Sequence, residues 1–455
     1  MVGAGRFALD RWTGLWPILL LALALRVTWA LLVPVHPISD AATYDMFARN
    51  IAAGRGYVFN DGSPTVYWPV GPSALYGVFY ALFGPSGWVV AVVNIVMGCG
   101  IVAGIYRIGL QRFDARVAAL AALIAAVWPV WIQFVTMPSC ELSFALFMVL
   151  AFAAFGEQRL PRWVRTLLST ALLVIAAFMR PTIVPLILLL PLLGGSLRQP
   201  LRTAGNVVLA LVLAALLFAP WMERNRALFG EPVLVSANFG ANLWMGNNPQ
   251  SHGRYMALPA VETKNEVTRD AHFKALAVTF IRENPGEFLR LCVKRIAISF
   301  DRETIGIVWN ARALSPAVQW AGKLVSTAYW LAVLAMAIVG VALWLLQNPA
   351  RLFDPLVVAP AMFAAVALIV VGQDRYHMPM MPFIALFAAY AIVRLAFRPA
   401  KRAAVAWSRP DHDHAARASR HHRASVQRAR ECASTCRGGR PRAARCAVGA
   451  GVRRR

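Results

Sequence analysis

About ten apolar segments, each roughly 15 to 25 residues long, dominate this sequence. A helix needs about 20 consecutive apolar residues to cross the hydrocarbon core of a bilayer. The composition agrees, because 59% of the 455 residues are hydrophobic and only 15% are charged. We therefore predict an all-α integral membrane protein, a polytopic bundle of about ten transmembrane helices. The predicted spans are 14–35, 88–110, 116–136, 139–156, 164–180, 182–196, 203–221, 322–346, 355–372 and 379–397.

Basic residues concentrate in alternate connections between these segments. Cytoplasmic loops of membrane proteins carry an excess of Lys and Arg, so the alternation predicts the orientation. With a cytoplasmic N-terminus, every basic group falls inside, and the connections 36–87 and 222–320 face the opposite compartment. The groups that agree are Arg6 and Arg11; Arg107, Arg112 and Arg116; Arg159, Arg162 and Arg165; Arg198 and Arg202; Arg351; and Arg398, Lys401 and Arg402.

The same pattern predicts how the chain is organised. Residues 1–397 are expected to form one transmembrane domain with a first outer loop, 36–87, and a large outer loop, 222–320; residues 398–455 are expected to form a basic cytoplasmic tail. The first apolar stretch has no small-residue cleavage site, so we expect it to be retained. The Ala- and Arg-rich usage fits a bacterium, which predicts the inner (cell) membrane, cytoplasmic termini and a periplasmic active site.

The net charge of +25 does not indicate a nucleic-acid partner, because of where the charge lies. Residues 401–455 contain 15 Lys and Arg against 3 Asp and Glu, a net of +12, and have no apolar periodicity, so we expect a disordered tail. Its clusters Asp411–His414, His421-His422 and Cys432-x3-Cys436 lack zinc-site spacing. We predict attraction to anionic membrane lipids instead.

The chain lacks the common nucleotide and metal motifs. It contains no GxxxxGK[ST], no GxGxxG after a strand, no HExxH and no CxxC pair. A soluble nucleotide-sugar site is therefore unsupported. We predict no cofactor and no metal ligands, and the sequence leaves metal dependence open.

The first long polar interruption runs from His36 to Gly71. Within it, Asp40 opens a short helical pattern, and Gly54 and Gly56 end that helix. An aromatic-proline run, Tyr67-Trp68-Pro69, follows a group of turn residues. A carboxylate held at a membrane face by an ordered loop suits chemistry on a lipid-linked substrate.

Asp40 has two interpretations. The functional one is a general base that takes a proton from an acceptor hydroxyl as it attacks the anomeric carbon of a sugar. The structural one is helix capping, because Ser and Asp are preferred at helix N-termini and Ser39-Asp40 opens this helix. Asp45, one turn later, is the weaker candidate and is expected on a solvated face.

Two charged residues lie within or at the start of predicted spans. Arg26 is about nine residues, or about 14 Å, from the outer end of the first span. A charge there costs about 2.5–3.5 kcal/mol on insertion scales, so it needs a partner inside the bundle. A carbonyl or ion-pair partner and a substrate role are both open. Glu141, near the outer start of the fourth span, raises the same two alternatives.

Two outer turns carry arginines. Arg180 precedes Pro181 between the fifth and sixth spans, and Asp374-Arg375-Tyr376-His377 lies between the ninth and tenth. The planar fork of arginine donors suits phosphate, and an interfacial anchor is the structural alternative. In the large outer loop, the amides of Asn238–Asn248 are candidates to bind a sugar or to form ordinary loop hydrogen bonds. Helices are expected at 263–282 and 288–300, with a break at Asn284-Pro285-Gly286.

In their order along residues 20–395, these features resemble the polytopic glycosyltransferases with the C-type fold. The resemblance is strongest to bacterial family 39 relatives of protein mannosyltransferases and to lipid A aminoarabinose transferases. The residues that carry it are Arg26; Asp40, Tyr44, Gly54, Gly56 and Tyr57; YWPVGP, starting at Tyr67, through LFG at Gly84; SCELSF around Glu141; MRP at Arg180; APWMERNRALFG (219–230); GANLWMGNNP (240–249); and DRYHMPMMP (374–382).

The resemblance implies a catalytic Asp at Asp40, a polyprenyl-phosphate sugar donor, inversion at the anomeric carbon and a donor-phosphate contact at Arg375. Two positions depart from the pattern of many relatives: Ala41 stands where a second acid follows the loop Asp, and Trp68 stands where a Lys contacts phosphate. The predicted substrate-binding residues are Arg375, Arg180, Glu141, Arg26, Tyr44, Tyr67, Asn247 and His377.

The predicted function is transfer of a sugar from a polyprenyl-phosphate donor to a lipid, glycan or protein acceptor outside the cytoplasm, as by a hexosyl- or mannosyltransferase. Two alternatives belong to other classes. A lipid or sugar transporter or flippase predicts broken helices near the midplane and two similar halves, neither of which the sequence indicates. A non-catalytic assembly partner is the other alternative, and the missing second acid favours it.

Overall fold

The computed structural model describes residues 14–195 and 199–396. The chain divides into a unit of residues 1–396 and a unit of residues 397–455, and all described residues belong to the first. The predicted tail, with its histidine and cysteine clusters, therefore lies outside the described residues. So do Arg6, Arg11 and Arg198 of the orientation pattern.

The described residues form helices joined by turns and loops, with one isolated β-bridge between Val58 and Pro64. The prediction of an all-α protein is confirmed. The α-helices are α2 (Trp16–Leu32), α3 (Ser39–Ala52), α4 (Val70–Phe83), α5 (Gly87–Arg112), α6 (Ala115–Ala126), α7 (Pro129–Gln133), α8 (Glu141–Phe155), α9 (Arg162–Met179), α10 (Pro185–Leu193), α11 (Pro200–Phe229), α12 (Phe239–Gly246), α13 (Glu266–Glu283), α14 (Pro285–Phe300), α15 (Ile305–Trp309), α16 (Pro316–Gln347), α17 (Pro355–Ile369) and α18 (Met381–Ala396). Short 3-10 helices are η1 (Phe134–Thr136), η2 (Pro181–Ile183), η3 (Ala311–Ala313), η4 (Pro349–Phe353) and η5 (Met378–Met380).

Each of the ten predicted spans coincides with a helix or a pair of helices, but fewer are long enough to cross a membrane. Within the described residues, five helices pass by length and apolarity, or six if the bent pair Ala115–Ala126 and Pro129–Thr136 is one span. The other predicted spans are apolar helices of 10–17 residues. They are shorter than expected because proline or glycine bounds them, as Pro181 and Gly194 bound the η2–α10 segment.

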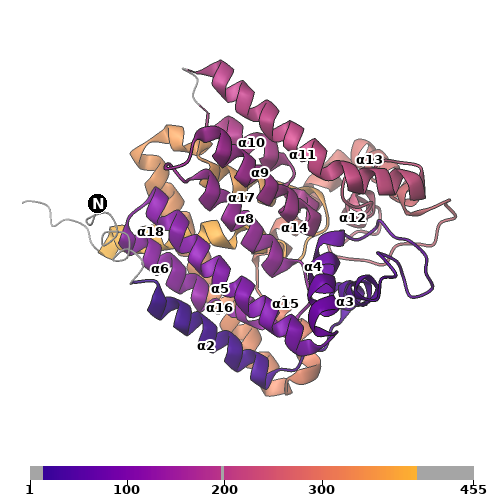
Figure 1. Ribbon diagram of the computed structural model, residues 1–455, viewed down its shortest axis with the longest axis horizontal. Coiled ribbons are helices and arrows are strands. Elements are labelled where there is room, and N and C mark those ends of the chain that lie inside the picture. The colour runs from indigo at the N-terminus through magenta and orange to yellow at the C-terminus, as the bar shows by residue number, and fades with distance from the viewer. Residues whose placement is uncertain (1–13, 196–198, 397–455) are drawn as a thin grey trace, which may run out of the picture. The chain divides into compact units, whose positions relative to one another are not determined.

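The bundle has a buried centre and an apolar periphery. The apolar window of the last helix, Met378–Ala396, is 83% buried, whereas those of α11 and α16 are 17% and 28% buried. The exposed side chains of α11 include Val208, Val212 and Leu216. A helix that presents such residues outward suits contact with lipid rather than water. The short helices α3, α4, α12 and α13 gather at one end of the bundle (Figure 1).

The arginine in the first span is held by a helix terminus. Arg26 is fully buried, and its Nη1 donates to the carbonyls of Ala22 at 3.1 Å and Ala126 at 2.9 Å. Ala126 is the last residue of α6, where backbone carbonyls lack helical partners and the helix dipole attracts a cation. Of the alternatives left open for Arg26, the carbonyl partner is the one found. The guanidinium thereby ties α2 to the bend between α6 and α7, which measures 52°.

The segment between α11 and α16 differs from its prediction in two details. The helix α11 continues to Phe229 and α16 begins at Pro316, so this segment is shorter than 222–320. The expected break at Asn284-Pro285-Gly286 is confined to Asn284, because Pro285 begins α14. Proline is favoured at the first helical position, where its missing N–H leaves no hydrogen bond unmade.

Close helix packing at Gly340 gives the first testable prediction. A Cβ at Gly340 of α16 would lie 2.0 Å from the carbonyl oxygen of Phe387 in α18, whereas a Cβ at Gly205 of α11 meets nothing within 4 Å. We expect Gly340→Ala to reduce the free energy of unfolding by about 1–3 kcal/mol, because the helices must separate. Gly205→Ala, the matched control, should be neutral or slightly stabilising. Thermal unfolding of the detergent-solubilised protein compares them, and equal midpoints would contradict the packing.

Candidate active site

An arginine between two carboxylates is the centre of the site. Arg375 Nη2 lies 2.6 Å from Asp40 Oδ2, and Arg375 Nη1 lies 3.7 Å from Glu141 Oε1. Asp40 comes from the first turn of α3, Glu141 is the first residue of α8, and Arg375 lies between α17 and α18. Three segments far apart in the sequence therefore meet at one cation.

Arg375 is further enclosed by neighbours from its own turn and from α15. Its Nε donates to Gln373 Oε1 at 2.7 Å, and its guanidinium carbon lies 5.2 Å from the ring centre of Trp309. Burial by itself would lower the pKa of Arg375, but the charges of Asp40 and Glu141 raise that pKa above its ordinary value. The guanidinium therefore stays charged, and its planar fork can bind a further anion.

The two carboxylates are held differently. The Asp40 side chain is 30% exposed, so a substrate can reach it, whereas that of Glu141 is 1% exposed. Both carboxylate oxygens of Glu141 are buried and accept no hydrogen bond from the described residues. A buried carboxylate without a hydrogen bond is costly and uncommon, and here the nearby charge of Arg375 offsets part of that cost.

The capping alternative for Asp40 is not what the structure shows. The helix α3 begins at Ser39, and no side chain caps its N-terminus. Asp40 directs its carboxylate at Arg375 instead. Ser39 has φ +53°, a left-handed conformation that is rare for a residue other than glycine. Strain of this kind is tolerated where surrounding contacts fix the backbone, and here it directly precedes the candidate base.

Asp45 is engaged elsewhere, although it is less exposed than expected. Its Oδ2 accepts from Arg49 Nε at 2.7 Å, and its Oδ1 accepts from the Tyr80 hydroxyl at 2.5 Å. The side chain is 14% exposed rather than fully solvated. Asp45 therefore links α3 to α4, and the two acids of α3 have separate roles.

Arg180 and Tyr44 extend the polar cluster. The guanidinium carbon of Arg180 lies 4.9 Å from the ring centre of Tyr376, next to Arg375 in the chain. Tyr44 lies one turn after Asp40 and is buried. Burial, followed by the nearby Cys140, Asp40 and Glu141, raises the pKa of Tyr44 well above its ordinary value. Its hydroxyl therefore keeps its proton and can donate a hydrogen bond.

Tyr67 belongs to a loop that two residues from later in the chain hold in place. Glu266, in the first turn of α13, accepts from the Thr65 hydroxyl at 3.0 Å, Val66 N at 2.7 Å and Tyr67 N at 2.9 Å. Arg224 donates to the carbonyls of Tyr57 and Thr65, both at 3.1 Å. Burial raises the pKa of Tyr67 to about 12. The aromatic-proline run is thus ordered by the segment 224–266.

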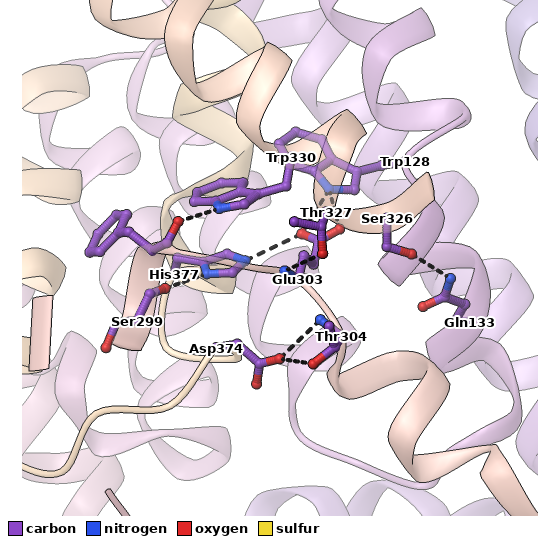
Figure 2. A network of polar contacts seen from close by, with 11 residues as sticks. Trp128, Gln133, Ser299, Glu303, Thr304, Ser326, Thr327, Trp330, Asp374 and His377 are labelled. Carbon is purple, nitrogen blue, oxygen red and sulfur yellow. Dashed lines mark hydrogen bonds and ion pairs between the residues drawn. The ribbon is translucent and has the colours of Figure 1, made fainter. Parts of the chain in front are cut away.

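Three predicted substrate-binding residues do not lie in this cluster. Arg26 binds the end of α6, as described above. Asn247 is buried and donates to the carbonyls of Leu243 and Ile369, both at 2.8 Å, which is the ordinary hydrogen bonding left open for it. His377 is fully buried, and both of its ring nitrogens bind protein atoms (Figure 2). Each of these three side chains is therefore engaged by other parts of the protein than the cluster around Arg375.

An apolar groove of about 570 Å³ begins one residue from Arg180. Its walls come from α4, α8, α9 and α11, and Met179 at its edge is the last residue of α9. A second cavity, of about 340 Å³, lies at the other ends of α5 and α8 and contains none of the predicted site residues. The groove is lined by Val70, Gly71, Ala74, Leu75, Val78, Phe147, Ile175, Phe178, Met179, Leu217, Pro220 and Trp221.

No group of three or more His, Cys, Asp and Glu side chains suited to hold a metal ion occurs in residues 14–195 and 199–396. Ala41, at the position of the second acid, is fully buried against the core. In the cluster, the carboxylates of Asp40 and Glu141 both lie within ion-pair distance of the Arg375 guanidinium.

Comparison with known proteins supports the resemblance seen in the sequence. A family model described as dolichyl-phosphate-mannose-protein mannosyltransferase matches residues 68–223. No curated protein matches the chain. The oligosaccharyltransferase AglB of Archaeoglobus fulgidus, solved with an inhibitory peptide and a dolichol-phosphate, matches with a TM-score of 0.50 at 14% identity. That match covers 84% of this chain and 51% of the archaeal one, so this chain spans about half of that relative's length.

ArnT from Cupriavidus metallidurans also matches. In its apo state the identity is 18% and the TM-score 0.40, with 84% of this chain and 78% of ArnT covered. For ArnT bound to undecaprenyl phosphate, the identity is 16% and the TM-score 0.42, with 84% of this chain and 79% of ArnT covered. At such identities, a likeness concerns the fold. The protein is a multi-pass membrane protein, and its helical fold is similar to that of AglB.

Several residues of the site escaped the sequence analysis as contributors. Tyr376 lies in the motif around Arg375, and Gln373 directly precedes that motif. Trp309 and Glu266 come from the long segment between α11 and α16, where the sequence has no pattern that relates them to Asp40. Only the folded chain brings them to the site.

The contacts of Glu266 give the second prediction. Glu266→Ala leaves buried donors of residues 65–67 without an acceptor, so we expect a loss of about 1–3 kcal/mol, localised to this loop. Tryptic cleavage after the exposed Arg55 should become faster than in the wild type. Glu262→Ala, which removes an exposed glutamate four residues earlier, is the control. Unchanged cleavage in Glu266→Ala would show that the loop is held in another way.

Proposed function

We propose that this protein is a membrane glycosyltransferase that transfers a sugar from a polyprenyl-phosphate donor to an acceptor outside the cytoplasm, with inversion of the anomeric carbon. The observation that carries the proposal is a partly exposed carboxylate paired with a largely buried arginine, together with an apolar groove that reaches Met179, the residue before Arg180. A carboxylate, a phosphate-binding cation and an apolar channel are the three features that a lipid-phosphate sugar donor requires. The match of residues 68–223 to the mannosyltransferase model supports the same reaction.

Asp40 is the general base in this proposal. The acceptor hydroxyl gives its proton to the Asp40 carboxylate while its oxygen forms a bond to the anomeric carbon. On the opposite side of that carbon, the bond to the phosphate oxygen breaks, and the lipid phosphate leaves with the electron pair. The attacking and leaving groups lie on opposite faces, so the configuration inverts. Asp40 is accessible for this role because its side chain is 30% exposed.

Arg375 stabilises the departing phosphate. The negative charge on the bridging oxygen grows as the bond breaks, so a fixed cation lowers the barrier more than it tightens ground-state binding. The Asp40 and Glu141 charges keep Arg375 protonated, and Gln373 and Trp309 limit its movement. Arg180 is the second phosphate contact, because it is one residue from the groove and lies against Tyr376.

The remaining residues of the cluster complete the sugar site. Glu141 is 1% exposed and lies 3.7 Å from Arg375 Nη1, so in this proposal it supports the cation from inside the protein. Tyr44 supplies a donor beside Glu141, and Tyr67 borders the site in the loop that Glu266 holds. The isoprenoid chain of the donor occupies the apolar groove between α4 and α11. A hexose such as mannose is the transferred sugar that we favour, and a lipid, glycan or protein is the acceptor.

The setting of the site follows from the charge pattern of the connections. We propose that residues 1–397 form the catalytic transmembrane domain in a bacterial inner membrane, with the cluster on the periplasmic face and both termini in the cytoplasm. The cluster draws its residues from the starts of α3 and α8, the end of α9 and the turn before α18. A transporter site would instead lie at interrupted helices near the membrane midplane, so this position favours the enzyme.

The base assignment gives the third prediction. Asp40→Asn removes the proton acceptor but keeps the side-chain shape, so sugar transfer should fall by about 100- to 10,000-fold, the typical contribution of general base catalysis. Expression and membrane insertion should be unchanged. Glycolipid mass spectrometry of membranes supplied with a polyprenyl-phosphate sugar measures the product. Asp45→Asn, which removes a carboxylate from the same helix, should retain most activity. Full activity in Asp40→Asn excludes the base assignment, and no activity in wild-type membranes favours the non-catalytic assembly partner.

The groove gives the fourth prediction. Ala74→Trp fills its α4 wall, so the KM for a donor with a long isoprenoid should rise about tenfold or more, because the chain loses its apolar contacts. A donor with a short isoprenoid should be affected less. Val212→Trp adds the same bulk at an exposed position of α11 outside the groove and serves as the control. Equal KM changes for long and short donors would contradict the assignment.

A further inference from the structure

The turn that carries Arg375 is fastened on both sides of that residue. Asp374 Oδ2 accepts from the backbone N and the hydroxyl of Thr304, at 2.9 and 2.8 Å. His377 contacts Ser299 at the end of α14 and Glu303 in the connection between α14 and α15 (Figure 2). Arg375 lies between these two attachment points, so its place in the site depends on them.

The geometry at His377 requires a proton between His377 and Glu303. Nδ1 lies 2.7 Å from the carbonyl oxygen of Ser299, which can only accept, so Nδ1 carries a proton. Nε2 lies 3.2 Å from Glu303 Oε1. A hydrogen bond there needs a second proton, either on Nε2 as an imidazolium facing a carboxylate or on Glu303 facing a neutral ring. In both forms one proton lies between Nε2 and Glu303, and the His377–Glu303 pair has no net charge.

Tryptophans enclose this pair. Trp128 Nε1 lies 3.0 and 3.1 Å from the two carboxylate oxygens of Glu303, and the ring of Trp330 stacks on His377 at 3.8 Å with an interplanar angle of 11°. Both Glu303 and His377 have fully buried side chains. Burial raises the pKa of Glu303, and His377 opposes this effect only in part. The raised pKa helps the pair to retain its proton.

We propose that Glu303 and His377 are positioning residues: their shared proton fastens the turn 370–378 to the α14–α15 connection and so fixes Arg375 for the donor phosphate. This inference rests on the proposed function only for the identity of the ligand. Neither residue touches the substrate, because both are enclosed by the protein. The pair acts through Arg375, which is two residues from His377.

Substitutions of Glu303 and His377 separate the hydrogen bond between them from the charge of the Glu303 carboxylate. In Glu303→Gln, the amide can donate to Nε2 of a neutral His377 while its oxygen accepts from Trp128, so the link survives without the proton. In Glu303→Leu and His377→Leu, the link is lost. The nearby bond from Gln133 Nε2 to Ser326 Oγ, at 2.9 Å, is buried and does not involve the turn, so Ser326→Ala is the matched control (Figure 2).

Hydrogen–deuterium exchange of the purified full-length protein in detergent tests the link without any substrate. We expect amides in 371–378 to exchange about tenfold faster in both leucine variants, and at nearly wild-type rates in Glu303→Gln and Ser326→Ala. If the leucine variants do not fold, Trp128→Phe, which removes one donor to Glu303, should give a smaller change in the same direction. Unchanged exchange in this turn, or a Gln variant as fast as the Leu variants, overturns the proposal.

Binding of undecaprenyl phosphate then tests whether the link acts through Arg375. Glu303→Leu should weaken the Kd by about tenfold in the wild-type background and leave it unchanged in an Arg375→Gln background. If Glu303→Leu weakens binding equally in both backgrounds, Glu303 has a structural role only, and the proposal that it positions Arg375 is overturned. If the wild type binds no polyprenyl phosphate, the proposed function fails, and the exchange result alone decides whether Glu303 and His377 fasten the turn.

Discussion

The cost of burying the Arg375 guanidinium organises this end of the molecule. A cation in a poorly hydrated site is stable only if anions and hydrogen-bond acceptors surround it, and Asp40, Glu141 and Gln373 meet that need. These partners come from α3, α8 and the turn before α18, so one charge fixes three distant segments relative to each other. The same arrangement leaves a reactive carboxylate partly exposed beside a cation.

Other buried arginines show what a structural role looks like. Arg26 binds carbonyls at the end of α6, and Arg295 binds the carbonyls of Gly246 and Leu368 together with Asn247. In both, the guanidinium donates to backbone carbonyls at the end of a helix, and the residue has no exposed surface. Arg375 differs because acidic side chains are its partners and part of it remains accessible.

Residues outside the cluster fix its loops in place through hydrogen bonds. Glu266 and Arg224 order the loop of Tyr67 from one side, while Thr304 and Glu303 hold the turn of Arg375 from the other. Arg224 lies in the last third of α11, and Glu266, Glu303 and Thr304 come from the segment between α11 and α16. These polar side chains act as supports, so the geometry of the cluster depends on hydrogen bonds as well as on apolar packing.

The sequence by itself determined the membrane class and the location of the long apolar helices, and it pointed to Asp40 and Arg375 as candidates. Apolarity is a local property, and the motifs around these two residues are contiguous, so both could be read without a structure. Helix lengths were less certain because proline and glycine end several helices early, as in α10. Only the tertiary structure separated Glu141, which lies at the cluster, from Arg26, Asn247 and His377, which are satisfied elsewhere. The reason is physical: a polar residue in an apolar sequence must find a partner, but its neighbours in the chain do not say which distant group that partner will be.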